Sequence, residues 1–182
     1  MKAILRKEIK RLKQELTPAG RLTFSQLICQ NIEQHPRWKA AQIVLAFYPL
    51  PDEPDLRPLL EHYYQEKRLL LPVVQGDQMV IRQYEGQASL SEGAFHILEP
   101  QGSDLPLPSL SIDLVLVPGV AFDAAGHRLG RGKGYYDQFF AANPQIVAAY
   151  KLGIAFPFQI VKERPTEPHD ICMNEVLGIF HN

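Results

Sequence analysis

Three glycines alternating with two cations form the part of this sequence best suited to chemistry. Residues 129–137 read LGRGKGYYD, which sets Arg131 and Lys133 between glycines and ahead of two tyrosines and Asp137. Glycine reaches backbone conformations closed to other residues and lets amide groups approach an anion, while the two cations supply charge. The pattern predicts a phosphate-binding loop. A tight, solvated turn with incidental cations is the structural alternative.

The spacing of this loop excludes the two commonest nucleotide-binding motifs. A Walker loop needs a glycine five residues before its Gly-Lys pair and a Ser or Thr directly after it, where this chain has His127 and Gly134. A dinucleotide-binding fingerprint would place its third glycine at Tyr135. The loop therefore belongs to another class of phosphate-binding sequence.

The residues on either side of the loop predict how it is held. The apolar run DLVLVPGVAF, residues 113–122, is typical of a buried strand that leads into the loop region, and YYDQFFAAN, residues 135–143, can form a short helix. A loop between a strand and a helix start aims free amides and the positive end of the helix dipole at a ligand.

Composition is that of an ordinary globular protein. Of the 182 residues, 46% are hydrophobic and 21% are charged, and the length fits one domain, so we expect a single domain over residues 1–182. Cys29 and Cys172 lie far apart without a CxxC pair, which predicts free thiols in a reducing compartment. No apolar signal core begins the sequence, and no run approaches the roughly 20 apolar residues of a membrane span. We expect a cytoplasmic protein with no membrane partner.

Positive charge is concentrated at the N-terminus. Residues 1–16 carry a charge of +4 and the remainder −5, for a net charge of −1. A protein that grips nucleic acid through bulk electrostatics normally has a basic domain. A small anion or a local RNA contact is therefore expected here rather than bulk binding of nucleic acid, and the final expectation is no nucleic-acid partner.

Apolar spacing predicts an alternation of helices and strands. Leu5, Ile9, Leu12 and Leu16 recur at helical spacing, and Thr17-Pro18 can cap and start a second helix that runs to about Glu33. Apolar runs predict strands at residues 43–48, 69–74, 79–84, 113–117, 147–156 and 175–180, with an amphipathic helix after the first. Residues 86–111 are expected to form a long surface loop.

This alternation predicts an α/β domain with a mainly parallel open sheet and helices on both faces. Ligands of such sheets bind beyond the carboxyl ends of strands. Three loops follow predicted strands, PLPDEPD after Tyr48, the glycine-rich segment after Val117 and PFQIVKERPTEPHD after Phe156. They could converge on one cleft.

Together these residues resemble a known family. The pattern VPGVAFDAAGHRLGRGKGYYDQFF at residues 117–140, the pair Lys2 and Arg6, Glu53 after FYPLPD and a late HD resemble the 5-formyltetrahydrofolate cyclo-ligases, also called methenyltetrahydrofolate synthetases. The resemblance spans nearly the whole chain. It implies an ATP-dependent ring closure of 5-formyltetrahydrofolate to 5,10-methenyltetrahydrofolate, with release of ADP and phosphate.

The resemblance assigns the cations and the glycine loop to ATP. It implies that Arg131 and Lys133 are catalytic, and that Lys2 and Arg6, which lie four apart on one helical face, reach the nucleotide phosphates. A solvated helix face is the alternative for that pair. The remaining implied ATP contacts are Arg128, Leu129, Gly130, Gly132, Gly134 and Tyr136.

The resemblance also implies a pterin site. Glu53 would accept paired hydrogen bonds from the aminopyrimidine of the folate, with an exposed loop acid as the alternative. Tyr48, Phe95 and Tyr135 would form an aromatic wall against the flat pterin, although Tyr and Phe are also routine core residues. The implied partners are ATP and 5-formyltetrahydrofolate alone, and the expected state is a monomer.

Asp137 and Asp170 are the implied ligands of Mg²⁺, an ion that prefers hard oxygen donors. The alternatives are a helix cap or ion pair for Asp137 and a turn carboxylate for Asp170. After Asp170 the chain reads ICMNEVLG, where the family tends to have a Pro soon after the Asp and a Thr in place of Gly178. The C-terminal contacts therefore follow less closely from the resemblance than the loop does.

Two rival functions use the same residues. An RNA- or nucleotide-binding module without chemistry would show salt-sensitive RNA binding and no ATP turnover. A different small-molecule kinase or ligase could share the scaffold. Neither rival accounts for Glu53 and the aromatic residues together with the glycine loop.

Overall fold

Two helices begin the chain and are separated by a capped turn. The computed structural model describes residues 1–163, 165–168 and 170–178, except for the side chain of Phe95; α1 spans Lys2–Glu15 and α2 spans Pro18–Gln34. Thr17 Oγ1 accepts a hydrogen bond from Gly20 N at 3.0 Å, and Pro18 stands in the first turn of α2. Thr17 accepts from one of the free amides of the first turn, and Pro18 has no amide N–H that would need a partner. The predicted start of α2 is confirmed.

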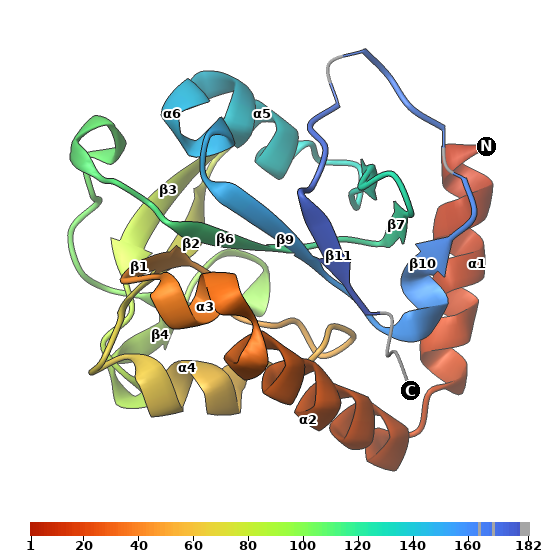
Figure 1. Ribbon diagram of the computed structural model, residues 1–182, viewed down its shortest axis with the longest axis horizontal. Helices are drawn as coiled ribbons and strands as arrows, with labels where there is room; N and C mark the ends of the chain where they lie inside the picture. Colours follow the sequence, from red (N-terminus) through yellow and green to blue (C-terminus); the bar gives the residue numbers. More distant parts are fainter. Residues whose placement is uncertain (164, 169, 179–182) are drawn as a thin grey trace.

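A six-stranded sheet, counted over the described residues, forms the centre of the fold (Figure 1). Its strand order is β11-β9-β6-β1-β2-β3, and neighbouring strands are parallel except for β3, which runs antiparallel to β2. The predicted mainly parallel open sheet is confirmed. The strands are β1 (Ile43–Leu45), β2 (Arg68–Gln75), β3 (Gln78–Gln83), β6 (Leu114–Pro118), β9 (Tyr150–Ile154) and β11 (Glu175–Leu177).

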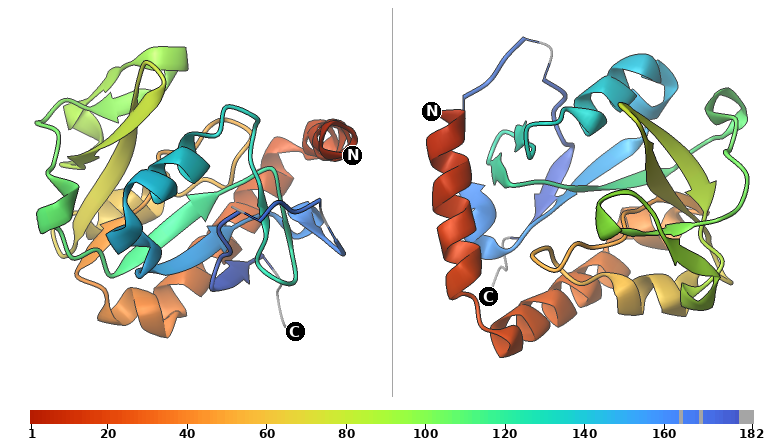
Figure 2. Two further views of the ribbon diagram at one scale, coloured as in Figure 1. Left: turned by 90° about the horizontal axis from the view of Figure 1, so that it is seen from above. Right: turned by 180° about the vertical axis from the view of Figure 1, so that it is seen from behind.

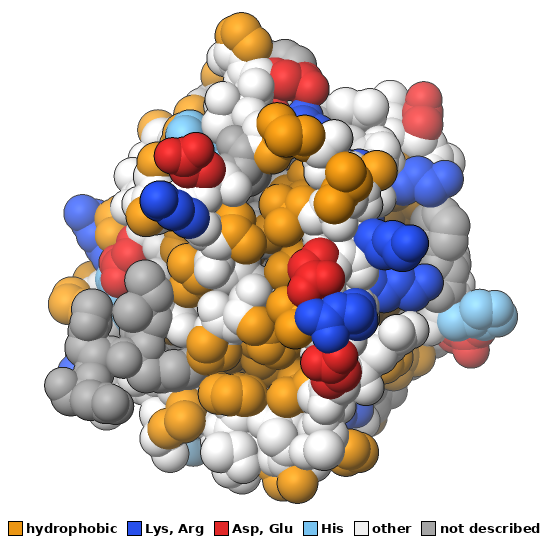
Figure 3. Space-filling view, turned by 90° about the vertical axis from the view of Figure 1, so that its right-hand side faces the viewer, with side chains coloured by type: hydrophobic (Ala, Val, Ile, Leu, Met, Phe, Trp, Pro, Cys, Tyr) orange, Lys and Arg blue, Asp and Glu red, His pale blue; other side chains and the backbone are white. Residues whose placement is uncertain are grey.

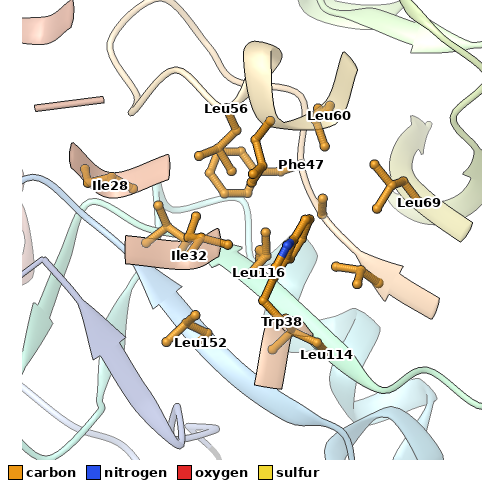
Figure 4. Close-up of a cluster of buried hydrophobic side chains, with 14 of the residues drawn as sticks. Ile28, Ile32, Trp38, Phe47, Leu56, Leu60, Leu69, Leu114, Leu116 and Leu152 are labelled. Atoms are coloured by element: carbon orange, nitrogen blue, oxygen red, sulfur yellow. The ribbon is translucent and has the colours of Figure 1, made fainter. Parts of the chain in front are cut away.

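Helices cover both faces of this sheet because successive strand residues point to opposite sides. Val44 and Leu116 pack into one core with α2, α3 (Pro36–Ala40) and α4 (Arg57–Tyr63), which Figure 4 shows around Trp38. Leu45 and Val115 pack into a second core with α5 (Tyr135–Ala142) and α6 (Pro144–Val147). Figure 1 shows α5 and α6 on one side of the sheet and α2 to α4 on the other.

A smaller sheet carries the glycine loop. Its strand β7 (Ala121–Asp123) pairs antiparallel with β8 (Arg128–Leu129) and parallel with β10 (Ile160–Val161). Ile9 of α1, which is 2% exposed, packs with Val120 and Leu129. Both views in Figure 2 place α1 beside this small sheet, so the cationic first helix is fixed close to the loop that follows β8.

Four element predictions differ from the structure. The strand predicted at 43–48 ends at Leu45, although Ala46 N still donates to Leu70 O at 2.9 Å. Residues 144–147 form the helix α6 because Pro144 fits a helix start, so β9 begins only at Tyr150. Residues 86–111 are not one long loop, since β4 (Leu90–Glu92) and β5 (Leu98–Pro100) pair within them. The last strand ends at Leu177, and residues 179 and 180 lie outside the described part.

Candidate active site

Two of the predicted loops meet beyond the carboxyl ends of β1 and β6. Arg131, on the glycine loop, reaches the loop after β1, where its two terminal nitrogens lie 2.7 and 3.3 Å from the two carboxylate oxygens of Asp52. Its Nη2 also lies 3.7 Å from Glu53 Oε2. The predicted phosphate-binding loop therefore lies next to the acid that is predicted to recognise the pterin.

The third predicted loop braces this site from the other side. Gln159, which follows β9, donates from Nε2 to the carbonyls of Gly119 and Val120 at 2.9 and 3.0 Å. Its Oε1 accepts from Phe156 N at 2.8 Å. Because Gln159 is 1% exposed, these buried bonds hold the segment that leads from β6 to the small sheet.

The glycine loop has the backbone that its sequence predicts. Gly132 has φ = +112° and Gly134 has φ = +72°, both in a region that other residues rarely adopt. Gly134 directly precedes α5, so the loop ends on a helix N-terminus, where amides lack intrahelical partners. Lys133 is exposed, and no described residue forms a hydrogen bond or ion pair with its side chain. Its ammonium is available to an anion.

The two predicted cations of α1 both contact site segments. Arg6 Nε donates to the carbonyl of Gly130 at 2.9 Å. Lys2 Nζ pairs with Glu167 Oε1 at 2.6 Å, in the segment that leads to Asp170. The pair is thus directed at the loops rather than standing on a solvated face.

Arg128 and Tyr136 pack against each other on the two sides of the loop. The guanidinium carbon of Arg128 lies 4.8 Å from the centre of the Tyr136 ring, and its Nε donates to Pro118 O at 2.5 Å. Burial raises the pKa of the Tyr136 hydroxyl, which therefore stays neutral. Leu129 is 2% exposed and packs toward α1, so only its backbone could meet a nucleotide.

Glu53 is a buried acid and not an exposed loop residue. It is 6% exposed, and Leu50 N donates to its Oε1 at 2.8 Å. Burial raises the pKa of its carboxyl, and the Leu50 amide, Arg131 and Lys13 oppose that rise only in part. A carboxylate held in this way suits a ligand that donates hydrogen bonds.

Tyr48 and Tyr135, two of the three residues predicted to form an aromatic wall, have different surroundings. Tyr48 packs at the edge of the core shared with α2 to α4, whereas Tyr135 donates its hydroxyl to Gly76 O at 3.2 Å, in the turn between β2 and β3. Among the described residues, the rings of Tyr48 and Tyr135 make no contact with each other. The side chain of Phe95 lies outside the described part, so its role stays a prediction.

The two predicted metal ligands differ in their surroundings. Asp137 stands in the first turn of α5, half-buried, and no described residue forms a hydrogen bond or ion pair with its carboxylate. Asp170 Oδ2 accepts from Glu167 N at 2.9 Å, and Asp170 N donates to Glu167 O at 3.0 Å. Over the described ranges, no three His, Cys, Asp or Glu residues gather as a complete metal site. Mg²⁺ takes one or two carboxylates together with water and substrate phosphates, which Asp137 fits.

Two charged residues at the site were missed in the sequence. Lys13 Nζ lies 3.4 Å from Asp52 Oδ2, and the Lys13 side chain is only 8% exposed. Partial burial would raise the pKa of Asp52, but Arg131 and Lys13 outweigh it and hold that pKa below its usual value. Spacing could have pointed to Lys13, because it follows Arg6 by seven residues and therefore shares its helical face.

A groove on the surface lies apart from this site. It encloses about 800 Å³ between α2, β11 and the turn from β7 to β8, and it is lined by residues such as Leu27, Asp123 and Glu175. None of the predicted site residues lines it. The candidate site is therefore identified from the residues that it brings together and not from the position of this groove.

The face that carries α1 mixes charges of both signs with apolar side chains, as Figure 3 shows. Arg11 pairs with Glu8 and Glu15 on the exposed side of the helix. The excess charge of the first helix is thus interrupted by acids rather than gathered into a basic surface. No helix over residues 1–163, 165–168 and 170–178 has the length and apolar character needed to cross a membrane.

Comparison with known proteins bears on this site. A model of the 5-formyltetrahydrofolate cyclo-ligase family matches residues 1–178. This chain belongs to that family. The 5-formyltetrahydrofolate cyclo-ligase of Mus musculus is 30% identical over 95% of this chain and 91% of its own length. That of Escherichia coli strain K12 is also 30% identical, over 93% of this chain and 95% of its own.

Solved structures agree with the family assignment. The NMR structure of 5,10-methenyltetrahydrofolate synthetase from Aquifex aeolicus is 33% identical and superposes with a TM-score of 0.84, covering 97% of this chain and 89% of its own. A 5,10-methenyltetrahydrofolate synthetase from Mycoplasma pneumoniae, 22% identical, has a TM-score of 0.76 over 97% of each chain, which shows the shared fold.

Proposed function

We propose that this member of the family closes the ring of 5-formyltetrahydrofolate to give 5,10-methenyltetrahydrofolate, using ATP and releasing ADP and phosphate. One observation carries the proposal beyond family membership. Arg131 of the glycine loop contacts Asp52 and lies 3.7 Å from Glu53, so a phosphate-binding element adjoins a buried acid suited to a pterin. Neither rival function calls for that adjacency.

The chemistry explains why phosphate-binding groups are wanted. A formamide is a poor electrophile because its nitrogen donates into the carbonyl, and its oxygen leaves reluctantly as water. Transfer of the γ-phosphoryl group of ATP to the formyl oxygen gives an iminium phosphate. The neighbouring secondary amine of the same folate then attacks the formyl carbon, and phosphate departs with the oxygen. Because the amine is tethered nearby, the protein mainly has to position two anions and neutralise charge on the phosphoryl group.

We assign the cations and the amides of the loop to that task. Lys133 and Arg131 would contact the transferred phosphoryl group, and the amides around Gly132 and Gly134 would bind its oxygens. Arg6 and Lys2 would reach the nucleotide from α1. A unit charge about 4 Å from a phosphate charge is worth roughly 4 kcal/mol at an effective dielectric of 20, so several aimed donors outweigh any one of them.

Mg²⁺ is the implied metal, and we propose Asp137 as its protein ligand, with Asp170 contributing through water. The carboxylate of Asp137 is half-buried at the end of the glycine loop and pairs with no described residue, which supports this assignment. A magnesium ion there would offset the charge of the nucleotide phosphates. We further propose that the chain is a single domain that acts as a monomer, without nucleic acid or membrane partners. We also propose that it acts in the cytoplasm, which the free thiols of Cys29 and Cys172 support because they suit a reducing compartment.

A direct assay tests the proposal. Protein, magnesium ATP and 5-formyltetrahydrofolate are mixed, and the near-ultraviolet absorbance of the methenyl product is followed. We expect a rise that requires ATP, and Lys133→Met should lower kcat about a hundredfold, the effect of losing one donor to a transition-state charge. Lys7→Met, an exposed cation of α1, is the matched control. No ATP-dependent rise in the wild-type protein would refute the proposed reaction.

A further inference from the structure

Four charged side chains meet between α1, the loop after β1 and the glycine loop. Asp52 is central: its Oδ2 lies 3.4 Å from Lys13 Nζ, and both of its oxygens accept from Arg131. Arg131 in turn lies 3.7 Å from Glu53 Oε2. Two cations and two carboxylates leave this charge cluster, made of Lys13, Asp52, Glu53 and Arg131, with no net charge.

Lys13 is withdrawn from water, unlike the exposed members of the charge cluster and unlike Lys10 on the same helix. Its side chain is 8% exposed, whereas those of Asp52 and Arg131 are 44% and 46% exposed. Lys10, one turn earlier on α1, is exposed and makes no hydrogen bond or ion pair with a described residue. A buried cation needs a compensating partner, and Asp52 is the carboxylate in contact with it.

The contact between Asp52 and Arg131 is bidentate, because two nitrogens of the guanidinium each donate to a carboxylate oxygen. Two parallel N–H···O bonds fix the plane of a guanidinium group, which a single contact leaves free to rotate. Arginine has five N–H donors, so this contact leaves others for a phosphate. Asp52 therefore restricts the orientation of Arg131 without consuming its capacity to bind an anion.

We propose that Asp52 and Lys13 are positioning residues for the phosphoryl transfer: Asp52 orients Arg131, and Lys13 cancels the charge of Asp52 so that the charge cluster does not repel the nucleotide. The inference rests on the proposed function, because it requires ATP as a substrate. Without Lys13, the other three members carry a net charge of −1 beside a polyanion. Without Asp52, the charge turns positive and Arg131 loses its fixed orientation.

Steady-state kinetics separate the two roles. Lys13→Met should raise the KM for ATP about tenfold, the scale of one uncompensated charge near the nucleotide, with a smaller effect on kcat. Asp52→Asn should lower kcat about tenfold without raising the KM for ATP, because the added positive charge favours nucleotide binding while Arg131 is misoriented. Lys10→Met makes the same change of charge on the exposed side of α1 and should leave both constants unchanged.

The double variant decides between a charge role and a purely structural one. In Lys13→Met with Asp52→Asn, only Glu53 and Arg131 remain charged, so the cluster is again neutral. Its KM for ATP should return to within about threefold of the wild-type value, although kcat stays low. A structural role predicts additive or greater damage. A double variant whose KM equals or exceeds that of Lys13→Met would overturn the proposal.

Two further results keep the test decisive. If Lys13→Met does not fold, Asp52→Asn carries the test alone, since a raised KM for ATP in that variant contradicts the inference and an unraised one with lowered kcat supports it. Lys13→Arg keeps the charge and should hold the KM for ATP within about threefold of wild type. An inactive wild-type protein would instead refute the proposed function, which separates the two failures.

Discussion

Arg6 donates from Nε to the carbonyl of Gly130 at 2.9 Å, which joins the first helix to the glycine loop across 124 positions of the chain. The carbonyl of Gly130 is not needed for anion binding, because phosphate is bound by amide N–H groups and not by carbonyls. The contact therefore anchors α1 without occupying a phosphate-binding group. The guanidinium of Arg6 thus lies beside the loop with donors to spare.

This contact predicts the effect of replacing Arg6. Arg6→Met should raise the KM for ATP about tenfold or more, since it removes both a cation and the anchor of the loop. Arg6→Lys should recover only part of the loss, because an ammonium cannot bind the carbonyl and a phosphate in the same planar arrangement. Initial rates at varied ATP concentration measure both effects, and equal constants for Arg6→Lys and wild type would contradict the anchoring role.

Gly132 predicts a backbone requirement in the same loop. With φ = +112°, the position is strained for any residue with a side chain, although a Cβ there would make only an ordinary contact with the guanidinium carbon of Arg6, at 3.8 Å. Gly132→Ala should therefore lower kcat/KM for ATP at least about tenfold by shifting the loop, a cost of about 1 to 3 kcal/mol for the strained backbone. Gly102→Ala, in open space and without a positive φ, is the control and should have no effect on kcat/KM.

The buried carboxyl of Glu53 predicts a pH dependence. Burial raises its pKa above the ordinary 4.5, with Asp52 adding to the rise and Arg131 and Lys13 opposing it. Because the pterin needs the carboxylate, the KM for folate should rise as pH falls toward the raised pKa, at a higher pH than an exposed glutamate would give. Glu53→Gln should abolish this dependence. The substrates titrate in the same way with either protein, so a difference between the wild-type and Glu53→Gln profiles reports on Glu53 alone. An unchanged profile in Glu53→Gln would exclude Glu53 as its source.

Gln159 predicts a contribution to stability. Gln159→Met keeps the volume of the side chain but leaves the carbonyls of Gly119 and Val120 and the amide of Phe156 without this partner. Each unpaired buried group costs about 1 to 3 kcal/mol, so we expect a loss of about 3 kcal/mol in the free energy of unfolding after partial relaxation. Urea denaturation measures it, with the exposed Gln145→Met as control. A loss below about 1 kcal/mol would show that the brace is dispensable.

The two thiols should react at different rates. Burial raises the pKa of Cys29 to about 12, and Asp55 and Glu33 add to the rise, whereas Cys172 is exposed. Since the thiolate is the reactive form, iodoacetamide at pH 8 should alkylate Cys172 at least about a hundredfold faster than Cys29. Peptide mass spectrometry follows both sites, and denaturant should equalise them. Equal rates in the native protein would contradict the burial of Cys29.

Much of the fold could be predicted from the sequence because local signals and tertiary packing agree. Thr17-Pro18 marks the start of α2, and the apolar runs mark strands that are buried on both faces. Short strands were not predicted where tertiary pairing decides. β7, β8 and β10 are two or three residues long, and such strands are defined by their partners rather than by their own periodicity.

The candidate site could be proposed from the sequence where the residue types themselves suit the chemistry, as with the glycines and cations of the loop. Asp52 and Lys13 were missed because their importance comes from a contact across 39 positions, which neither residue reveals locally. The aromatic wall and the metal pair depend on how distant segments face one another, and their roles remain predictions.

The central claim is that the glycine loop and Glu53 bind the two substrates side by side, which a structure with both substrates bound tests directly. Crystals grown with a non-hydrolysable ATP analogue, magnesium and 5-formyltetrahydrofolate should show the terminal phosphate at the amides of residues 130–134 and at Arg131. The pterin should be hydrogen-bonded to Glu53. Ligands placed instead in the groove between α2 and β11, with the loop and Glu53 unoccupied, would contradict the account.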